Sequence, residues 1–151
     1  MVNINGMAHI QLSVTDMARS APFYRRLLNF LSLTTIVDSD DYLYCVGGRT
    51  GVAISAVAPE FKNTVFNQLR TGLNHICFRA RSREDVDAIH QVAIELDARV
   101  LHPPEEGHFA PGYYSVLFED PDGIRIEANF VPGKGHLEEG RELPLKARGV
   151  Y

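Results

Sequence analysis

Apolar and polar residues alternate along several short stretches of this chain, a pattern that predicts strands with one buried face. Over Met7–Val14 the apolar side chains occupy even positions from Ile10 onward, and the polar ones occupy odd positions from His9 to Ser13. Successive strand residues point to opposite sides, so His9 and Gln11 share the polar face.

An amphipathic helix is predicted directly after this strand. Residues 16–19 turn the chain, and Ser20 is the expected N-cap of a helix over 21–28. Pro22 falls in the first turn of that helix, where its missing N–H costs no intrahelical hydrogen bond.

Three β-like runs separated by turn-forming residues follow the helix, at Leu31–Val37, Tyr42–Val46 and Val52–Val57. The first half is therefore predicted as a βαβββ module over about 7–58. Residues 59–71 form a connection with one helical turn.

The second half repeats this order. Leu73–Ala80 is a strand whose polar face carries His75, Cys77 and Arg79. Ser82, with an acid three residues later, is typical of a helix N-cap, and apolar residues from Val86 onward recur at helical spacing.

A hairpin closes the second half. After the short extended run 99–102 and a Pro- and Gly-rich loop at 103–112, two β-rich runs flank Asp-Pro-Asp-Gly at 120–123. In the run after that turn, Glu127 alternates with apolar neighbours and so lies on the polar face of its strand. The second module spans about 72–130, and residues 131–151 are predicted as an irregular C-terminal arm.

The two halves read as a duplication. His-Ile-Gln-Leu-Ser-Val at His9 aligns with His-Ile-Cys-Phe-Arg-Ala at His75, and placing Gly51 on Gly123 puts Ser55 on Glu127. One module alone cannot bury a curved sheet. The two modules should therefore pair about a pseudo-twofold axis as one α+β domain, 1–151. The curved sheet would then enclose a cavity.

Composition argues against a nucleic-acid-binding protein and against a membrane protein. Net charge is −4, charged residues make up 23%, and no basic cluster indicates a nucleic-acid surface. Cys45 and Cys77 are isolated from each other, and the sequence shows no signal peptide, so both are expected to be reduced thiols. No apolar run approaches the ~20 residues that span a bilayer. We expect a cytoplasmic protein without a membrane partner.

His9, His75 and Glu127 stand out because two imidazoles and a carboxylate from three strands are the donor set that borderline divalent metals prefer. For either histidine alone, a structural role is the simpler interpretation. Their occurrence at duplicated positions favours metal binding.

The paired βαβββ modules, the His-Ile-Gln-Leu-Ser-Val strand and the Phe118–Glu127 hairpin resemble the vicinal oxygen chelate superfamily of glyoxalases, bleomycin-resistance proteins and extradiol dioxygenases. The resemblance covers about 7–130. It implies that His9, His75 and Glu127 bind a divalent metal ion (Ni, Co, Zn, Mn or Fe(II)) on which a small oxygenated substrate is chelated.

The chain departs from several branches of that superfamily. Ser55 stands where glyoxalase I has a second Glu, and Leu117 where extradiol dioxygenases have a Tyr. Gln11 stands where fosfomycin thiol transferases have a Thr. The metal-free binding proteins usually lose the triad that is complete here.

Further residues are candidates for catalysis and substrate binding. A general base could come from Tyr113, Tyr114 or His108. The candidate substrate-binding residues are Gln11, Ser55, Arg79 and Arg125. The two arginines share faces with His75 and Glu127, which suits an anionic small-molecule substrate.

We therefore expect a metal-dependent lyase or isomerase of glyoxalase type. An extradiol-type iron dioxygenase and a non-catalytic antibiotic-binding protein are the alternatives. The resemblance further implies a homodimer, and related folds complete their sites either within one chain or across two.

Overall fold

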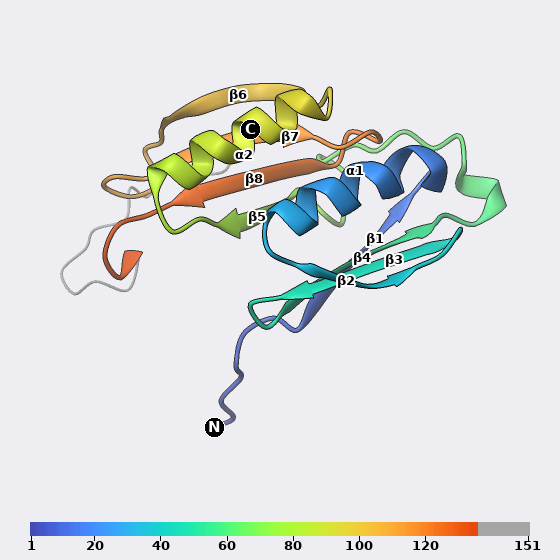
Figure 1. Ribbon diagram of the computed structural model, residues 1–151, viewed down its shortest axis with the longest axis horizontal. Coiled ribbons are helices and arrows are strands. Elements are labelled where there is room, and N and C mark those ends of the chain that lie inside the picture. The colour runs from blue at the N-terminus through green and yellow to red at the C-terminus, as the bar shows by residue number, and fades with distance from the viewer. Residues whose placement is uncertain (136–151) are drawn as a thin grey trace. The chain divides into compact units, whose positions relative to one another are not determined.

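The computed structural model describes residues 1–135 and shows an α+β fold, in which the βαβββ order predicted for each half is confirmed (Figure 1). Two compact units divide these residues. Met1–Phe66 group with Pro121–Gly123, and Asn67–Asp120 group with the described residues that follow Gly123. Of the predicted C-terminal arm, residues 136–151 lie outside the described part.

The first unit holds a four-stranded sheet in the order β1-β4-β3-β2. Its strands are β1 (His9–Val14), β2 (Thr34–Asp38), β3 (Tyr42–Gly47) and β4 (Thr50–Ala56). β1 runs parallel to β4, and the other pairs are antiparallel. The connection that follows contains a 3-10 turn, η1 (Pro59–Phe61), as predicted.

Helix α1 (Met17–Phe30) begins earlier than the sequence pattern indicated. Its N-cap is Asp16, whose carboxylate accepts from the Ala18 N–H at 2.9 Å, and Ser20 lies inside the helix. Residues 17–19 therefore form the first turn of α1, and Pro22 falls beyond it. The prediction was wrong because both residues are good caps, and only the path of the chain into the helix selects between them.

The second unit repeats the order with β5 (His75–Arg79), α2 (Arg83–Glu95), β6 (Arg99–Glu106), β7 (Tyr114–Glu119) and β8 (Arg125–Phe130). Its sheet has the order β5-β8-β7-β6, with β5 parallel to β8. The Ser82 hydroxyl caps α2 by accepting from the Asp85 N–H, as predicted.

Strand β6 is longer than the predicted 99–102 run and includes Pro103 and Pro104. An edge strand tolerates prolines, since an N–H that would face away from its neighbour is not needed. Its pairing with β7 shifts register on both sides of His102, which accommodates the interruption.

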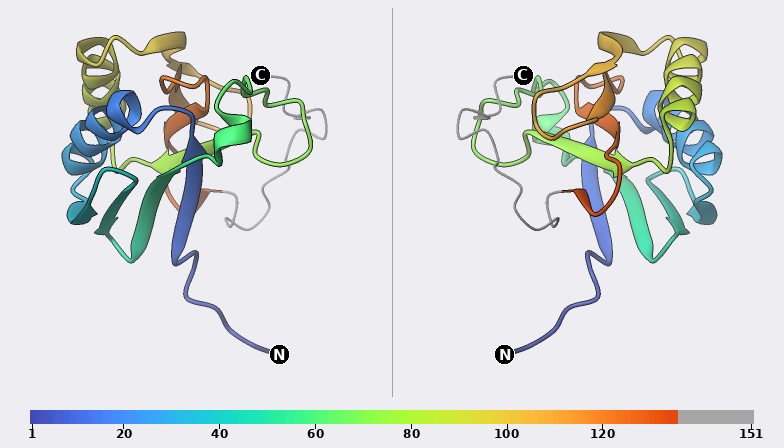
Figure 2. Two further views of the ribbon diagram at one scale, coloured as in Figure 1. Left: turned by 90° about the vertical axis from the view of Figure 1, so that its right-hand side faces the viewer. Right: turned by 90° about the vertical axis from the view of Figure 1, so that its left-hand side faces the viewer.

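Each helix packs on one face of its own sheet (Figure 2). In the second unit the buried face of α2, including Val86, Ile89 and Val92, contacts β6, β7 and β8. Ile126 and Ala128 of β8 are each 1% exposed. The opposite face of the same sheet therefore carries Glu127. Within residues 1–135, neither helix has the length and apolar character that a membrane span requires.

The two modules superpose in sheet register when they are aligned on His9 and His75, and not when they are aligned on the turn glycines Gly51 and Gly123. His9 pairs with Gly51 and Gln11 with Ala53, whereas His75 pairs with Arg125 and Cys77 with Glu127. Counted from each histidine, the counterpart of Glu127 is therefore Ala53. The predicted equivalence of Ser55 and Glu127 is wrong by two residues.

The cause of this offset is the length of the two hairpin turns. Gly48 and Arg49, with φ of 55° and 68°, form a two-residue turn between the Gly47 and Thr50 pair. The second turn runs from Asp120 to Ile124, whose N–H donates to the Asp120 carboxylate at 2.7 Å. Gly123 there has the positive φ, 86°, that the sequence predicted.

The helix cap yields a matched test. Asp16→Ala should lower the free energy of unfolding by about 1 kcal/mol, because the Ala18 N–H loses its partner. Ser20→Ala should leave it unchanged or slightly higher, since the buried Ser20 hydroxyl has no hydrogen-bond partner among the described residues. Urea denaturation of both variants measures this, and equal losses would contradict the assignment of the cap.

Candidate functional site

Glu127 is the most buried charged side chain among the candidate residues, at 1% exposure. Strand β8 places it between Leu117 of β7 and Cys77 of β5 in the sheet register. A buried carboxylate is stable only with strong partners, because removal from water penalises the charged form. Two residues of the same unit supply them.

Tyr113, at the start of the closing hairpin, donates its hydroxyl hydrogen to Glu127 Oε1. Asn129 Nδ2 in turn donates to the Tyr113 oxygen at 2.9 Å. Burial, and to a lesser extent the hydrogen bond and charge of Glu127, raise the pKa of the Tyr113 phenol. The structure therefore places Tyr113 as a hydrogen-bond partner of Glu127, and its role as a general base stays a prediction.

His75 contacts the other oxygen of the carboxylate. Its Nε2 lies 3.2 Å from Glu127 Oε2, and its Nδ1 lies 2.8 Å from Asn74 Oδ1. With Nδ1–H donating to Asn74, Nε2 presents a lone pair toward a carboxylate oxygen. A proton on Nε2 would make this contact a His–Glu ion pair, and a neutral imidazole would instead direct its lone pair and the carboxylate at a shared metal ion. The two side chains are thus of a type and at a spacing that fit the implied metal.

His9, the third predicted ligand, is the first residue of β1 and is exposed in the first unit. No group of three or more His, Cys, Asp or Glu suited to a metal forms within residues 1–135. The second unit thus brings together His75 and Glu127, and His9 is described with its own unit. Gln11 shares the polar face of β1 and donates to the Ser55 hydroxyl at 3.2 Å.

Tyr114 does not lie with Glu127. Its hydroxyl donates to Asp87 of α2 at 2.8 Å, and Arg83 of α2 stacks over its ring at 4.7 Å from the centroid. The side chain therefore lies on the helix face of the sheet, on the other side from Glu127. Adjacent strand residues alternate in side, and the sequence alone left open which tyrosine faced Glu127.

The remaining predicted residues make no contact with Glu127 that the structure records among the described residues. His108 is exposed in the loop between β6 and β7. Arg79 is exposed at the end of β5, in register with Asn129. Arg125 lies in register with His75 and is largely buried, with 12% of its side chain exposed.

Two residues that the sequence reasoning missed are Asn129 and Asn74. Asn129 follows Glu127 by two positions in the same strand, so the alternation that identified Glu127 could have found it too. Asn74 immediately precedes β5, where no periodic signal exists. Asn74 contacts the His75 imidazole only because the ring is turned with Nδ1 toward the Asn74 side chain, and the sequence does not indicate that orientation.

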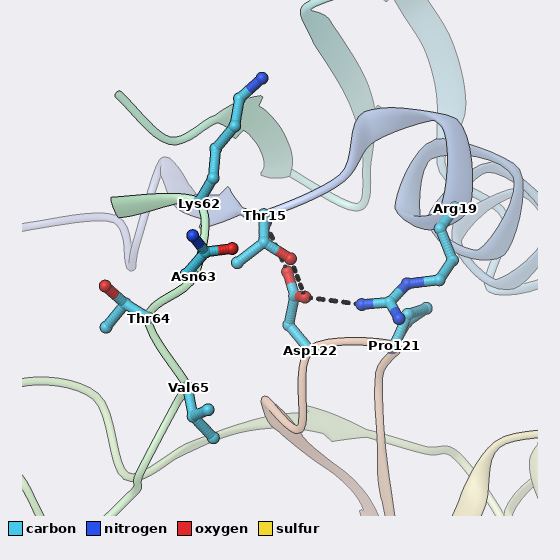
Figure 3. A pocket seen from close by; sticks show the side chains of 8 residues that line it. All are labelled: Thr15, Arg19, Lys62, Asn63, Thr64, Val65, Pro121 and Asp122. Carbon is cyan, nitrogen blue, oxygen red and sulfur yellow. Dashed lines mark hydrogen bonds and ion pairs between the residues drawn. The ribbon is translucent and has the colours of Figure 1, made fainter. Parts of the chain in front are cut away.

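A separate cavity of about 270 Å³ lies in the first unit (Figure 3). The Asp122 carboxylate at its edge accepts from Thr15 N–H at 2.7 Å and from the Thr15 hydroxyl at 2.5 Å, and it pairs with Arg19 at 2.9 Å. Figure 3 shows the Lys62 side chain extending away from this carboxylate. None of the predicted site residues lines this cavity.

Comparison with known proteins agrees with the fold. Residues 6–128 match the family model of the Glyoxalase/Bleomycin resistance protein/Dioxygenase superfamily. The uncharacterised Bacillus subtilis protein YqjT is 30% identical over 125 residues, covering 80% of this chain and 95% of that protein. The metallothiol transferase FosB of Shouchella clausii is 25% identical over 126 residues, covering 83% and 80%.

Solved structures show the same architecture. A proposed glyoxalase from Bacillus halodurans superposes with a TM-score of 0.74 at 29% identity, covering 84% of this chain and 96% of that one. A glyoxalase/bleomycin resistance protein from Albidiferax ferrireducens has a TM-score of 0.66 at 24% identity, covering 83% and 98%. The second likeness is one of fold alone.

The Tyr113 hydrogen bond can be tested by stability. Tyr113→Phe should lower the free energy of unfolding in EDTA by about 2 kcal/mol, because a buried carboxylate oxygen loses its donor. Tyr114→Phe is the control, with a loss under about 1 kcal/mol, since its bond to Asp87 is solvent-accessible. Chemical denaturation measures both, and a larger loss for Tyr114→Phe would contradict the contrast in burial.

Proposed function

The chain belongs to the Glyoxalase/Bleomycin resistance protein/Dioxygenase superfamily, and on this premise we propose that it is a divalent-metal-dependent enzyme acting on a small oxygenated molecule. The reaction class we propose is that of a glyoxalase-like lyase or isomerase. The observation that carries the proposal is the approach of His75 Nε2 to the buried Glu127 carboxylate, 3.2 Å from its Oε2.

His9, His75 and Glu127 are the residues that would hold the ion. When bound, a divalent metal supplies Lewis-acid stabilisation of negative charge on two neighbouring substrate oxygens. The chain itself prepares the ligands. Asn74 sets the tautomer of His75, and Tyr113 holds one carboxylate oxygen of Glu127 so that the other faces the imidazole.

Gln11 and Ser55 of the first unit are the neutral polar candidates for substrate binding. The Gln11 amide and the Ser55 hydroxyl bond to each other on the polar face of the sheet. Both groups can also donate to a substrate oxygen. The candidates for moving a proton stay Tyr113, Tyr114 and His108. Tyr113 donates to Glu127, Tyr114 donates to Asp87 of α2, and His108 is exposed in its loop.

A second candidate function is transfer of a thiol to the substrate. It is favoured by the similarity to FosB, a metallothiol transferase, over 83% of this chain. Gln11 in place of the Thr of fosfomycin thiol transferases counts against that substrate. An extradiol reaction has less support, because the position of its Tyr is held here by Leu117, which is 2% exposed.

Metal content tests the ligand assignment. The purified chain should bind about one divalent ion, and His9→Ala, His75→Ala and Glu127→Ala should each weaken binding at least about tenfold, because three ligands are needed to hold a catalytic ion. His90→Ala, which removes a histidine from α2, is the matched control and should bind as the parent does. Elemental analysis after dialysis, with circular dichroism for folding, measures the outcome. Full retention in any of the three variants would remove that residue from the site.

The reaction class is tested by oxygen dependence. A lyase or isomerase should turn over equally with and without oxygen, whereas a dioxygenase consumes it. Mass spectrometry of the products separates the thiol transferase, whose product carries the added thiol. Obligatory oxygen uptake would overturn the lyase or isomerase assignment.

A further inference from the structure

Arg125 of the second unit is a largely buried arginine with hydrogen-bond donors that are unmet within the described part of the chain. It occupies β8 in register with His75 on one side and Glu119 on the other, and it lies two residues before Glu127 on the same face. Only 12% of its side chain is exposed. Its Nε and Nη1 atoms are buried and have no hydrogen-bond partner among residues 1–135.

The nearby carboxylate does not compensate these donors. Arg125 Nε is 3.8 Å from Glu119 Oε1, which is beyond hydrogen-bond range. Glu119 already has a closer cation, since Arg99 Nη1 lies 3.1 Å from its Oε2. A buried guanidinium with unmet donors is unfavourable, so such a group in a native protein calls for an explanation, and a bound ligand, ion or water is one.

We propose that Arg125 binds an anionic group of the substrate, a carboxylate or another oxyanion, beside His75 and Glu127. The proposal rests on the function proposed above and names the substrate class of that site. A guanidinium presents donors in a planar fork that matches a carboxylate, and charge-assisted bonds of this kind are the strong ones. The substrate would thus be an oxygenated organic acid, with its acidic group on Arg125.

The competing explanation is that Arg125 serves only as a counter-charge for Glu119. The two roles predict opposite effects of Arg125→Met on folding. A binding residue with unmet donors can be replaced by an apolar side chain of similar length with an unchanged or higher urea midpoint. A structural counter-charge would lower the midpoint, and that result would overturn the proposal.

Ligand binding gives the direct test. Metal-free protein, prepared with EDTA and dialysed, is titrated at fixed ionic strength with pyruvate, with inorganic phosphate and with the neutral analogue pyruvamide. We expect pyruvate or phosphate to bind and pyruvamide not to bind detectably. Arg125→Gln should weaken anion binding by roughly 10- to 100-fold.

The matched control is Arg99→Gln. Arg99 contacts the same Glu119 carboxylate, but its side chain is 75% exposed. Anion affinity of this variant should stay within about twofold of the parent, because exposed ion pairs contribute little. Arg125→Lys keeps the charge without the planar fork, so it should bind more weakly than the parent but more tightly than Arg125→Gln.

Equal binding of pyruvate and pyruvamide, or equal losses in Arg125→Gln and Arg99→Gln, would overturn the proposal. These outcomes are separable from failure of the proposed function. A chain that binds metal through His75 and Glu127 but binds anions without Arg125 loses only the anion site. A chain that binds anions through Arg125 but holds no metal loses only the metal-dependent function.

Discussion

The buried carboxylate of Glu127 is the constraint around which the second unit is organised. At 1% exposure it must be compensated from within the protein, and each of its oxygens has a different partner. Tyr113 reaches it from the start of the hairpin, and His75 reaches it from the neighbouring parallel strand. Both depend on the register of β5, β7 and β8, so a slip of one residue would move Glu127 to the face that α2 covers.

The duplication gives the two units the same order of elements but different chemistry. In the first unit the position matching Glu127 is Ala53, beside Gln11, so the polar face of that sheet carries His9 and neutral polar groups without a matching carboxylate. The second hairpin has the longer turn, which Asp122 ties to Thr15 and Arg19 through hydrogen bonds and an ion pair.

Within residues 1–135, some side chains on the polar face of the second unit have all their hydrogen-bond partners within the protein and one does not. Glu127, Tyr113 and Asn129 form a connected hydrogen-bond network, which fixes one arrangement of the carboxylate. Arg125 is in the adjacent row of the same sheet, but two of its nitrogens have no partner among the described residues. The polar face thus places a fixed carboxylate in the row next to a guanidinium whose nearest carboxylate, that of Glu119, lies beyond hydrogen-bond range.

The sequence by itself determined the element order and the residues on the polar faces. Alternation of period two identified His9, His75 and Glu127, and Asp-Pro-Asp-Gly identified the hairpin, because both signals are local. Only the tertiary structure decided that Asp16 rather than Ser20 caps α1, that Tyr114 faces α2, and that Ala53 rather than Ser55 matches Glu127. Each of these depends on how distant segments pair. Local pattern gives the side of a strand on which a residue lies, whereas strand pairing and helix packing determine its neighbours.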